Sequence, residues 1–298
     1  MPRVLVPPIK CQGIKTKLVP LILKNVPSPI VGRWIEPFMG SGVVGLNVKP
    51  RRAVFADQNP HLVAFYDALR NGSITPESVR SFLEEEGALL FERGDDYYYY
   101  IRDRFNANGN PLDFLFLSRS CFNGMIRFNN KGEFNVPFCR KEARFSKAYI
   151  TKIVNQVAAF RQVVAWRHWA FRCQDFLDTL MDAAEGDFIY CDPPYIGRHA
   201  DYFNGWTDED ENRLFQLLVS TKARFILSTW HSNKYRSNEY VENLWSRFNI
   251  VTKDHFYHVG AKEVNRNAMK EALVMNFVPL CEHIRQSRTV QIQLFGTH

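Results

Sequence analysis

Short apolar runs, rich in β-branched and aromatic residues, alternate with amphipathic stretches at both ends of this 298-residue chain. This alternation predicts parallel strands joined by crossover helices, which limits the fold to an α/β sheet with helices packed on it. Thr207 and Asp210 form a capping-box pattern, with Asp in place of the usual Glu, before the last predicted helix. The predicted strands are residues 33–36, 52–56, 170–173, 188–191, 224–228 and 272–276, and the predicted helices are residues 16–25, 42–48, 60–71 and 208–220.

The alternation breaks in the middle of the chain. From about Leu62 to Trp166 the strand signal gives way to helical and loop sequence. We therefore expect a sheet domain formed by residues 1–62 and 166–298, with a mainly helical second domain, residues 63–165, inserted into it. Within the insertion, the four consecutive tyrosines at 97–100 are expected on a buried or half-buried helix rather than on a ligand platform.

The basic surplus is concentrated in one segment of the insertion. The chain has a net charge of +7, and the segment from Arg119 to Lys152 holds eight basic residues against two acidic ones. Basic residues interleaved with aromatic ones suit phosphate contacts and base stacking, so the segment is a candidate nucleic-acid surface; a solvated basic face is the alternative. The interleaved aromatic residues are Phe122, Phe128, Phe134, Phe138 and Phe145.

Cysteine and histidine spacing predicts no metal site. The six cysteines are scattered without a C-x-x-C pair, and His255 and His258 have no third ligand nearby, so we expect reduced thiols and structural or surface histidines. No stretch reaches the roughly 18 apolar residues of a membrane span, and the first residues lack the apolar core of a signal peptide. The expected location is therefore cytoplasmic, with no membrane partner.

A glycine-rich turn, Glu36-Pro37-Phe38-Met39-Gly40-Ser41-Gly42, follows the first predicted strand and leads into a helix. Glycines allow a tight turn and close approach of a ligand, and the helix N-terminus offers free N–H groups to an anionic part of it. Asp57 ends the next predicted strand, where a carboxylate can accept hydrogen bonds from two ribose hydroxyls. The pair indicates a cofactor that contains a nucleoside.

The tetrapeptide Asp192-Pro193-Pro194-Tyr195 directly follows the apolar strand at 188–191. Ligands of open α/β sheets bind at the carboxyl ends of strands, and the two prolines fix a backbone whose carbonyls point outward. A carboxylate and a carbonyl that both accept from an exocyclic amine draw its lone pair out of ring conjugation, and Tyr195 can stack on the ring. The motif therefore predicts chemistry on an amino group of a flat ring.

Together these motifs resemble the Dam-like group (D12 class, alpha-group) of DNA adenine-N6 methyltransferases. In that group the cofactor motif precedes the catalytic motif, and the target-recognition domain lies between them. Five elements carry the likeness in the same order, and it extends from about Pro8 to Phe277: Phe38-x-Gly40-x-Gly42, Asp57, residues 122–129, residues 132–138 and Asp192–Tyr195. The resemblance implies a Rossmann-like S-adenosylmethionine-dependent methyltransferase sheet with an inserted, mainly helical target-recognition domain.

The resemblance also implies the cofactor and the residues that hold it. S-adenosylmethionine is the expected methyl donor and S-adenosylhomocysteine the product; residues 37–42 are expected around the methionine part, Lys15 near its carboxylate, Asp57 at the ribose and Phe176 beside the adenine. The chain departs from the group at Cys11 and at Gly13-Ile14, where an aromatic residue and a Gly-Gly pair are usual. The expected cofactor-binding residues are Cys11, Lys15, Glu36, Pro37, Phe38, Gly40, Gly42, Asp57, Asn59, Phe176 and Asp192.

Double-stranded DNA is the partner that the resemblance implies. Phe122 corresponds to an aromatic wedge that enters the base stack and Arg127 to a reader of guanine, for which its planar fork suits O6 and N7. Three asparagines correspond to contacts with phosphates or bases. The expected DNA-binding residues are Arg119, Phe122, Asn123, Arg127, Asn129, Lys131 and Asn135.

The implied reaction is methylation of adenine N6, catalysed by Asp192, Pro193, Pro194 and Tyr195 without a metal, after the base is flipped out of the duplex. Residues 6–17, 118–124 and 195–199 look most like a type II modification enzyme whose target is GATATC. Another target such as GATC, cytosine-N4 transfer, methylation of RNA or of protein glutamine, and a non-catalytic DNA-binding module remain alternatives. We further expect a monomer or weak dimer, and a loop from His199 to Trp206, with Tyr202 and Phe203, that closes over the flipped base.

Overall fold

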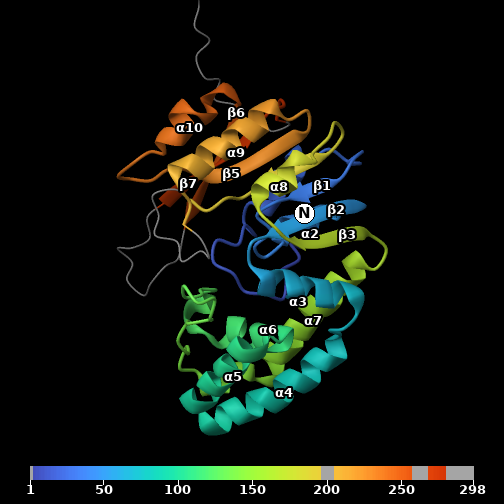
Figure 1. The fold of residues 1–298 in the computed structure, drawn as a ribbon, viewed down its shortest axis with the longest axis vertical. Coiled ribbons are helices and arrows are strands. Elements are labelled where there is room, and N and C mark those ends of the chain that lie inside the picture. The colour runs from blue at the N-terminus through green and yellow to red at the C-terminus, as the bar shows by residue number, and fades with distance from the viewer. Residues whose placement is uncertain (1–2, 196–204, 257–267, 280–298) are drawn as a thin grey trace, which may run out of the picture.

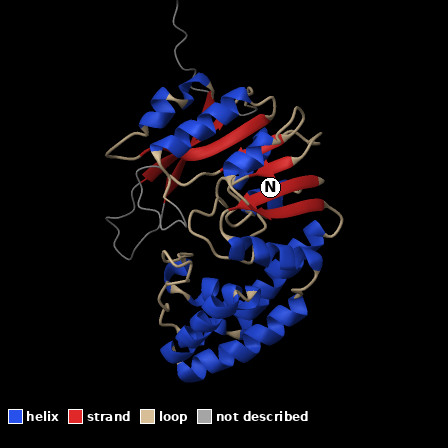
Figure 2. Cartoon of the chain, viewed as in Figure 1, coloured by secondary structure: helices blue, strands red, loops and turns tan. Residues whose placement is uncertain are grey.

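The computed structural model describes residues 3–195, 205–256 and 268–279. A seven-stranded sheet in the order β3-β2-β1-β4-β5-β7-β6 forms one end of the molecule, and a group of helices forms the other (Figures 1 and 2). Strands β1 to β5 run parallel, whereas β7 is antiparallel to both β5 and β6. The strands are β1 (Trp34–Glu36), β2 (Arg52–Asp57), β3 (His168–Cys173), β4 (Phe188–Cys191), β5 (Arg224–Ser232), β6 (Asn249–Phe256) and β7 (Ala268–Met275).

Helices cover both faces of the sheet, as the hydrophobic clusters show. On one face, Ile35, Ile189 and Phe225 pack against α8 (Phe176–Met181), α9 (Asp208–Ser220) and α10 (Glu239–Asn243). On the other face, Trp34 and Tyr190 pack in a cluster that includes α1 (Val19–Asn25), α2 (Val43–Val48) and α3 (Pro60–Asn71). Strands β1, β4 and β5 thus bury side chains on both faces, as parallel strands in α/β sheets do.

The helical end of the molecule continues from the second of these faces. It contains α4 (Pro76–Arg93), α5 (Asp95–Asn108), α6 (Pro111–Ser120) and α7 (Lys147–Val164), together with the short helices η1 (Phe122–Gly124) and η2 (Glu142–Phe145). Its core belongs to the same hydrophobic cluster as Trp34 and Tyr190, and α3 contacts both the sheet and α6. The helical end is therefore joined to the sheet by packed side chains as well as by the chain itself.

The α/β architecture predicted from the alternating pattern is confirmed, and every predicted strand and helix overlaps one in the structure. Thr207 and Asp210 form the predicted capping box at the start of α9. Tyr97 and Tyr98 are buried in α5, while Tyr100 is exposed, as expected for consecutive aromatic residues on a helix. The sequence prediction missed β6, which contains few apolar residues and lies at the edge of the sheet.

In the described ranges, no helix is long and apolar enough to cross a membrane. Among those same residues, no three His, Cys, Asp or Glu side chains gather where they could hold a metal ion. Cys281 and His258, which enter the sequence prediction on metals, lie outside the described residues.

Candidate functional site

The two predicted motifs meet at the point where the strand order reverses. The chain runs from β1 outward to β2 and β3, and then returns to place β4 and β5 on the other side of β1. Strands β1 and β4 are therefore parallel neighbours, and the segments that follow them, 37–42 and 192–195, leave the sheet at the same edge. This reversal point is where open α/β sheets bind their ligands.

The glycine-rich turn after β1 is held to the end of β2 by backbone hydrogen bonds. The Met39 amide donates to the Ala56 carbonyl at 2.8 Å, and the Gly40 amide donates to Oδ2 of Asp57 at 2.9 Å. Gly40 has φ +48°, and a Cβ atom there would meet nothing within 4 Å among the atoms described around it. The turn thus needs glycine for its conformation and has open space on its outer side.

Asp57 and Asn59 organise the end of β2. Both carboxylate oxygens of Asp57 accept backbone N–H groups at 2.9 Å, one from Gly40 and the other from Asn59. Burial raises the pKa of Asp57 above its usual value, although the hydrogen bonds from these two amides oppose the shift. The side chain of Asn59 caps α3 by accepting from the amides of His61 and Leu62. Because a carboxylate has about four acceptor sites, Asp57 can still accept from a ligand.

Glu36, the last residue of β1, holds the start of α2 through hydrogen bonds of its carboxylate. Its side chain is only 2% exposed, and Oε2 accepts from Trp34 Nε1 at 2.8 Å and from the Gly45 amide at 3.1 Å. Burial raises its pKa to about 8, so the carboxyl group can carry a proton near neutral pH. A Cβ at Gly45 would overlap the Phe55 ring, so α2 lies directly against β2 here. Glu36 therefore fixes α2 to β1, on the inner side of the turn.

Lys15 and Asp192 form a partly buried ion pair at the end of β4, with Lys15 7% and Asp192 20% exposed. The distance between Lys15 Nζ and Asp192 Oδ1 is 2.8 Å, and the Lys15 ammonium also donates to the Gly13 carbonyl at 2.9 Å and lies 5.0 Å from the centre of the Tyr195 ring. Burial raises the pKa of Asp192 to about 6, although Lys15 acts in the opposite direction. Burial also lowers the pKa of Lys15, but the acidic groups around it, Asp192 first and then Tyr195, more than compensate, so that its pKa lies well above the usual value.

Aromatic rings cluster beside the turn. Phe38 stacks on Phe176 with ring centres 5.3 Å apart, and Trp206 lies 5.4 Å from Phe38 and 5.3 Å from Phe176. Trp206 Nε1 donates to Glu211 Oε2 at 2.7 Å, which fixes its orientation. Sequence reasoning placed Trp206 only at the end of a closing loop. Residues 199–204 of that loop, including Tyr202 and Phe203, lie outside the described residues.

Cys11 and Glu271 lie close to the site and influence it through burial and charge. Burial raises the pKa of the Cys11 thiol, and Asp57 raises it further, so Cys11 is a neutral, unreactive side chain near the ribose-binding candidate. Glu271 on β7 is 1% exposed and raises the pKa of Asp192. Sequence reasoning missed Glu271; its only signal is an acidic residue directly before the apolar end of a strand.

The loops between α6 and α7 lie on the side of the helical end that faces the sheet (Figure 1). They carry the predicted wedge, Phe122, which is 50% exposed and follows directly after α6. Its backbone N–H donates to the Pro137 carbonyl at 2.8 Å, and Asn123 has φ +54°. A large ring is thus presented on a backbone that the neighbouring segment holds in place.

The predicted guanine reader lies in a short hairpin in which Phe128 pairs with Phe134. Arg127 Nε donates to Oδ1 of Asn135 at 2.9 Å, and both residues line an open depression of about 680 Å³ together with Lys131. The Asn129 side chain closes the hairpin: its Oδ1 accepts from the amides of Lys131 and Glu133, and its Nδ2 donates to the Glu133 carboxylate.

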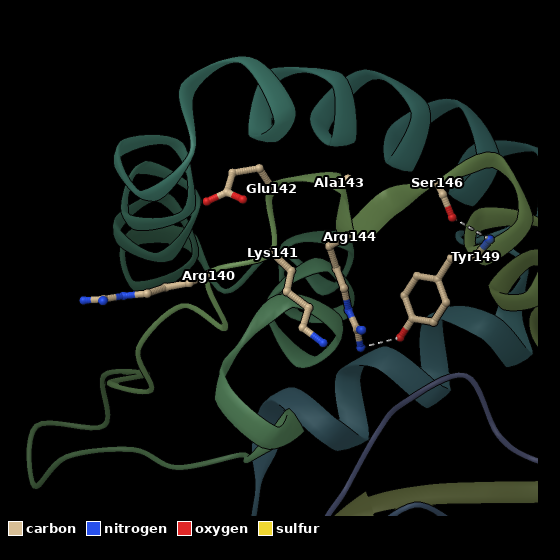
Figure 3. Close-up of a pocket in the computed structure, with 7 residues that line it drawn as sticks. All are labelled: Arg140, Lys141, Glu142, Ala143, Arg144, Ser146 and Tyr149. Atoms are coloured by element: carbon tan, nitrogen blue, oxygen red, sulfur yellow. Dashed lines mark hydrogen bonds between the residues drawn. The ribbon is translucent and has the colours of Figure 1, made fainter. Parts of the chain in front are cut away.

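A second basic depression, of about 520 Å³, is lined by residues of the segment 140–149, around η2 and the start of α7 (Figure 3). Arg140, Lys141 and Arg144 line it, and the Arg144 guanidinium donates to the Tyr149 hydroxyl at 2.9 Å. Sequence reasoning counted these basic residues in the charged segment without assigning them to a site.

Arg119 occupies a different environment from the other predicted DNA-binding residues. It is 6% exposed, and its guanidinium donates to the Pro8 carbonyl and to the Gln156 side chain. The predicted DNA-binding set therefore divides into surface residues and one buried arginine.

Comparison with known proteins gives a consistent result. Residues 12–259 match the family described as D12 class N6 adenine-specific DNA methyltransferase. The DNA adenine methylase of Serratia marcescens is 34% identical over 236 residues, which cover 74% of this chain and 82% of that protein. The type II methyltransferase M.MjaIII of Methanocaldococcus jannaschii is 30% identical over 302 residues, covering 91% and 99%. The type II methyltransferase M.FokI of Planomicrobium okeanokoites is 27% identical over 91% of this chain. The chain spans only 42% of the length of M.FokI, and likewise 42% of the length of the modification methylase StsI of Streptococcus sanguinis.

Proposed function

This chain belongs to the D12 class N6 adenine-specific DNA methyltransferase family, and from that premise we propose that it transfers a methyl group from S-adenosylmethionine to N6 of adenine in double-stranded DNA. One observation carries the proposal. The Asp192–Tyr195 segment leaves the sheet beside the glycine-rich turn at the strand-order reversal, so an acceptor of amine hydrogen bonds adjoins a nucleoside-binding candidate.

The side chains at this edge fit S-adenosylmethionine. Asp57 keeps acceptor sites for ribose hydroxyls, and the open space outside Gly40 leaves room for a ligand close to the backbone. The Lys15–Asp192 pair is complementary to the carboxylate and ammonium groups of the methionine part. Phe38 and Phe176 offer apolar surface for the adenine. When bound, the cofactor supplies an electrophilic methyl group.

The protein's part in the transfer is to hold and polarise the target amine. The Asp192 carboxylate and a proline carbonyl after β4 accept the two N6 hydrogens, which concentrates the nitrogen lone pair toward the methyl group. Tyr195 stacks on the flipped base. N6 loses one proton once it is methylated, and Asp192, with its pKa of about 6, is the base closest to that nitrogen.

On the DNA side, we assign sequence reading and duplex distortion to the loops between α6 and α7. Exposed Phe122 fills the gap that the flipped base leaves, Arg127 reads guanine, and Lys131 contacts phosphate. Asn123 and Asn135 stand beside these residues, while Asn129 shapes the hairpin. In this proposal residues 1–62 and 166–298 form the catalytic and cofactor-binding domain, and residues 63–165 form the target-recognition domain.

For the target sequence we propose GATATC, as in a type II restriction–modification system. The support is the likeness of residues 6–17 and 118–124 to the EcoRV modification methyltransferase, and Arg127 accounts for one guanine of that site. The inner base pairs can be read through DNA deformability as well as through contacts.

The test is methyl transfer from labelled S-adenosylmethionine to two duplexes that differ only in an intact or scrambled GATATC, followed by nucleoside mass spectrometry. N6-methyladenine in the first duplex alone is the expected result. Modification of both duplexes, or of GATC in other DNA, contradicts the target, and N4-methylcytosine contradicts the adenine assignment. Cofactor binding without modification of any DNA contradicts the proposed function.

A further inference from the structure

Arg119 is a charged side chain that is buried and hydrogen-bonded to other groups of the protein. It lies in the last turn of α6, and its Nε donates to the Pro8 carbonyl at 2.7 Å. One terminal nitrogen donates to the same carbonyl and to Oε1 of Gln156 on α7, the latter at 2.6 Å. A buried guanidinium is costly unless such partners replace its water. To reach a phosphate, Arg119 would have to give up these bonds.

The segment that Arg119 holds leads to Lys15, which pairs with the candidate catalytic residue Asp192. After Pro8 the chain passes Lys10, whose methylene chain lies so close to Gly124 that a Cβ there would overlap it. Seven residues beyond Pro8, Lys15 pairs with Asp192. Residues 8–15 therefore contact the recognition loops at one end and the candidate active site at the other.

The backbone of Arg119 is fixed as firmly as its side chain. The Arg119 carbonyl accepts from Arg144 Nε at 2.6 Å, and the neighbouring Ser120 carbonyl accepts from the Cys139 amide at 3.0 Å. The exposed wedge candidate, Phe122, follows three residues after Arg119. One side chain thus connects the start of the recognition loops to the segment that carries Lys15.

We propose that Arg119 is a positioning residue that holds residues 8–15 against the start of the recognition loops, and thereby sets the place of Lys15 in the cofactor site. The inference rests on the proposed function, because it assigns Lys15 to cofactor binding. It removes Arg119 from the predicted DNA-binding set and makes cofactor affinity depend on a residue of the recognition region.

Two binding measurements distinguish a positioning residue from a phosphate contact. The first is the Kd of S-adenosylmethionine in the absence of DNA, and the second is the salt dependence of DNA binding. Arg119→Met keeps the apolar stem but removes the donors, and Lys131→Met is the matched control, an exposed lysine of the same loops. We expect Arg119→Met to weaken S-adenosylmethionine binding by about tenfold or more and to leave the salt slope unchanged. Lys131→Met should keep the cofactor affinity and lower the slope by about one.

The opposite pattern overturns the inference: Arg119→Met binds S-adenosylmethionine like the wild type and loses about one unit of salt slope. A variant that is merely less stable, with normal cofactor affinity in its folded fraction, overturns it as well. If Arg119→Met does not fold, Gln156 carries the test. Gln156→Leu should weaken cofactor binding several-fold and Gln156→Glu should restore it, whereas wild-type affinity in both variants contradicts the inference. A wild-type protein that binds neither S-adenosylmethionine nor DNA contradicts the proposed function itself.

Discussion

The Lys15–Asp192 pair makes a quantitative prediction about pH. The pKa of Asp192 is about 6, raised by burial and held down by Lys15. Asp192 must be ionised to accept hydrogen bonds from the target amine, so methyl transfer should rise with pH and reach half its maximum near pH 6. In Lys15→Met the stem remains but the charge is lost, and the carboxylate becomes harder to ionise.

The size of the shift follows from the partial burial of the pair, in which Lys15 is 7% and Asp192 20% exposed, so the lower end of the range for buried charges applies. Leaving a buried charge without its partner costs about 3–5 kcal/mol. About 1.4 kcal/mol corresponds to one pH unit. The acidic limb of the pH–rate profile, where the rate rises with pH, should therefore shift to higher pH by at least about two units. At pH 7 the ionised fraction of Asp192 would fall from about 90% to about 10%, and the lost activity should return by about pH 10.

The assay is the single-turnover rate of methyl transfer to a duplex, measured between about pH 5 and pH 10 with both substrates saturating. Saturation separates the effect on Asp192 from weaker cofactor binding. Lys24→Met, which removes an exposed lysine on α1, should leave the limb in place. If Lys15→Met loses rate equally at every pH and keeps the wild-type pH of half-maximal rate, Lys15 does not set the ionisation of Asp192.

Two further predictions concern the framework that brings the site together. Asp187 accepts from the Arg33 backbone amide at 2.6 Å and pairs with its guanidinium at 2.7 Å; Asp187→Ala should therefore lower the free energy of unfolding by about 3 kcal/mol in urea titrations at pH 7. Because these contacts depress the pKa of Asp187, their stabilisation is present above its unfolded pKa and is lost as the pH falls, so an equal deficit at pH 3 and pH 7 would count against this account. Gly45→Ala places a methyl group against the Phe55 ring and 2.8 Å from the Glu36 carboxylate. Overpacking of about 1–3 kcal/mol should outweigh the gain of about 1 kcal/mol in helix propensity, and a Tm at or above that of the wild type would contradict this.

The sequence predicted the sheet because apolar runs and helical periodicity are local signals. Strand β4 and helices α3 and α9 begin and end at the predicted residues, where prolines, Thr207 and turn residues mark the boundaries. Strand β6 escaped prediction because it contains few apolar residues, and its antiparallel pairing with β7 is a long-range property. The order of the strands likewise cannot be read from local pattern.

The candidate site was predictable where a motif is contiguous and not where it is assembled from distant segments. Sequence alone proposed the turn and Asp192–Tyr195 as site segments, and the structure places both at the same edge of the sheet. The ion pair of Lys15 with Asp192 joins residues 177 positions apart, and Lys15 was expected near a cofactor carboxylate instead. Arg119 was grouped with the surface cations because composition does not reveal burial, and Glu271 has no local signal that would mark it as part of the site.

The most direct test of the central claim compares wild-type protein with Asp192→Ala on a duplex that contains GATATC. Labelled methyl transfer under single-turnover conditions is measured beside the Kd of the same duplex. We expect the variant to lose detectable formation of N6-methyladenine while it keeps most of its DNA affinity, because Asp192 polarises the target amine and the recognition loops lie elsewhere. Methyl transfer by Asp192→Ala at the wild-type rate would contradict the assignment of the reaction to this edge of the sheet.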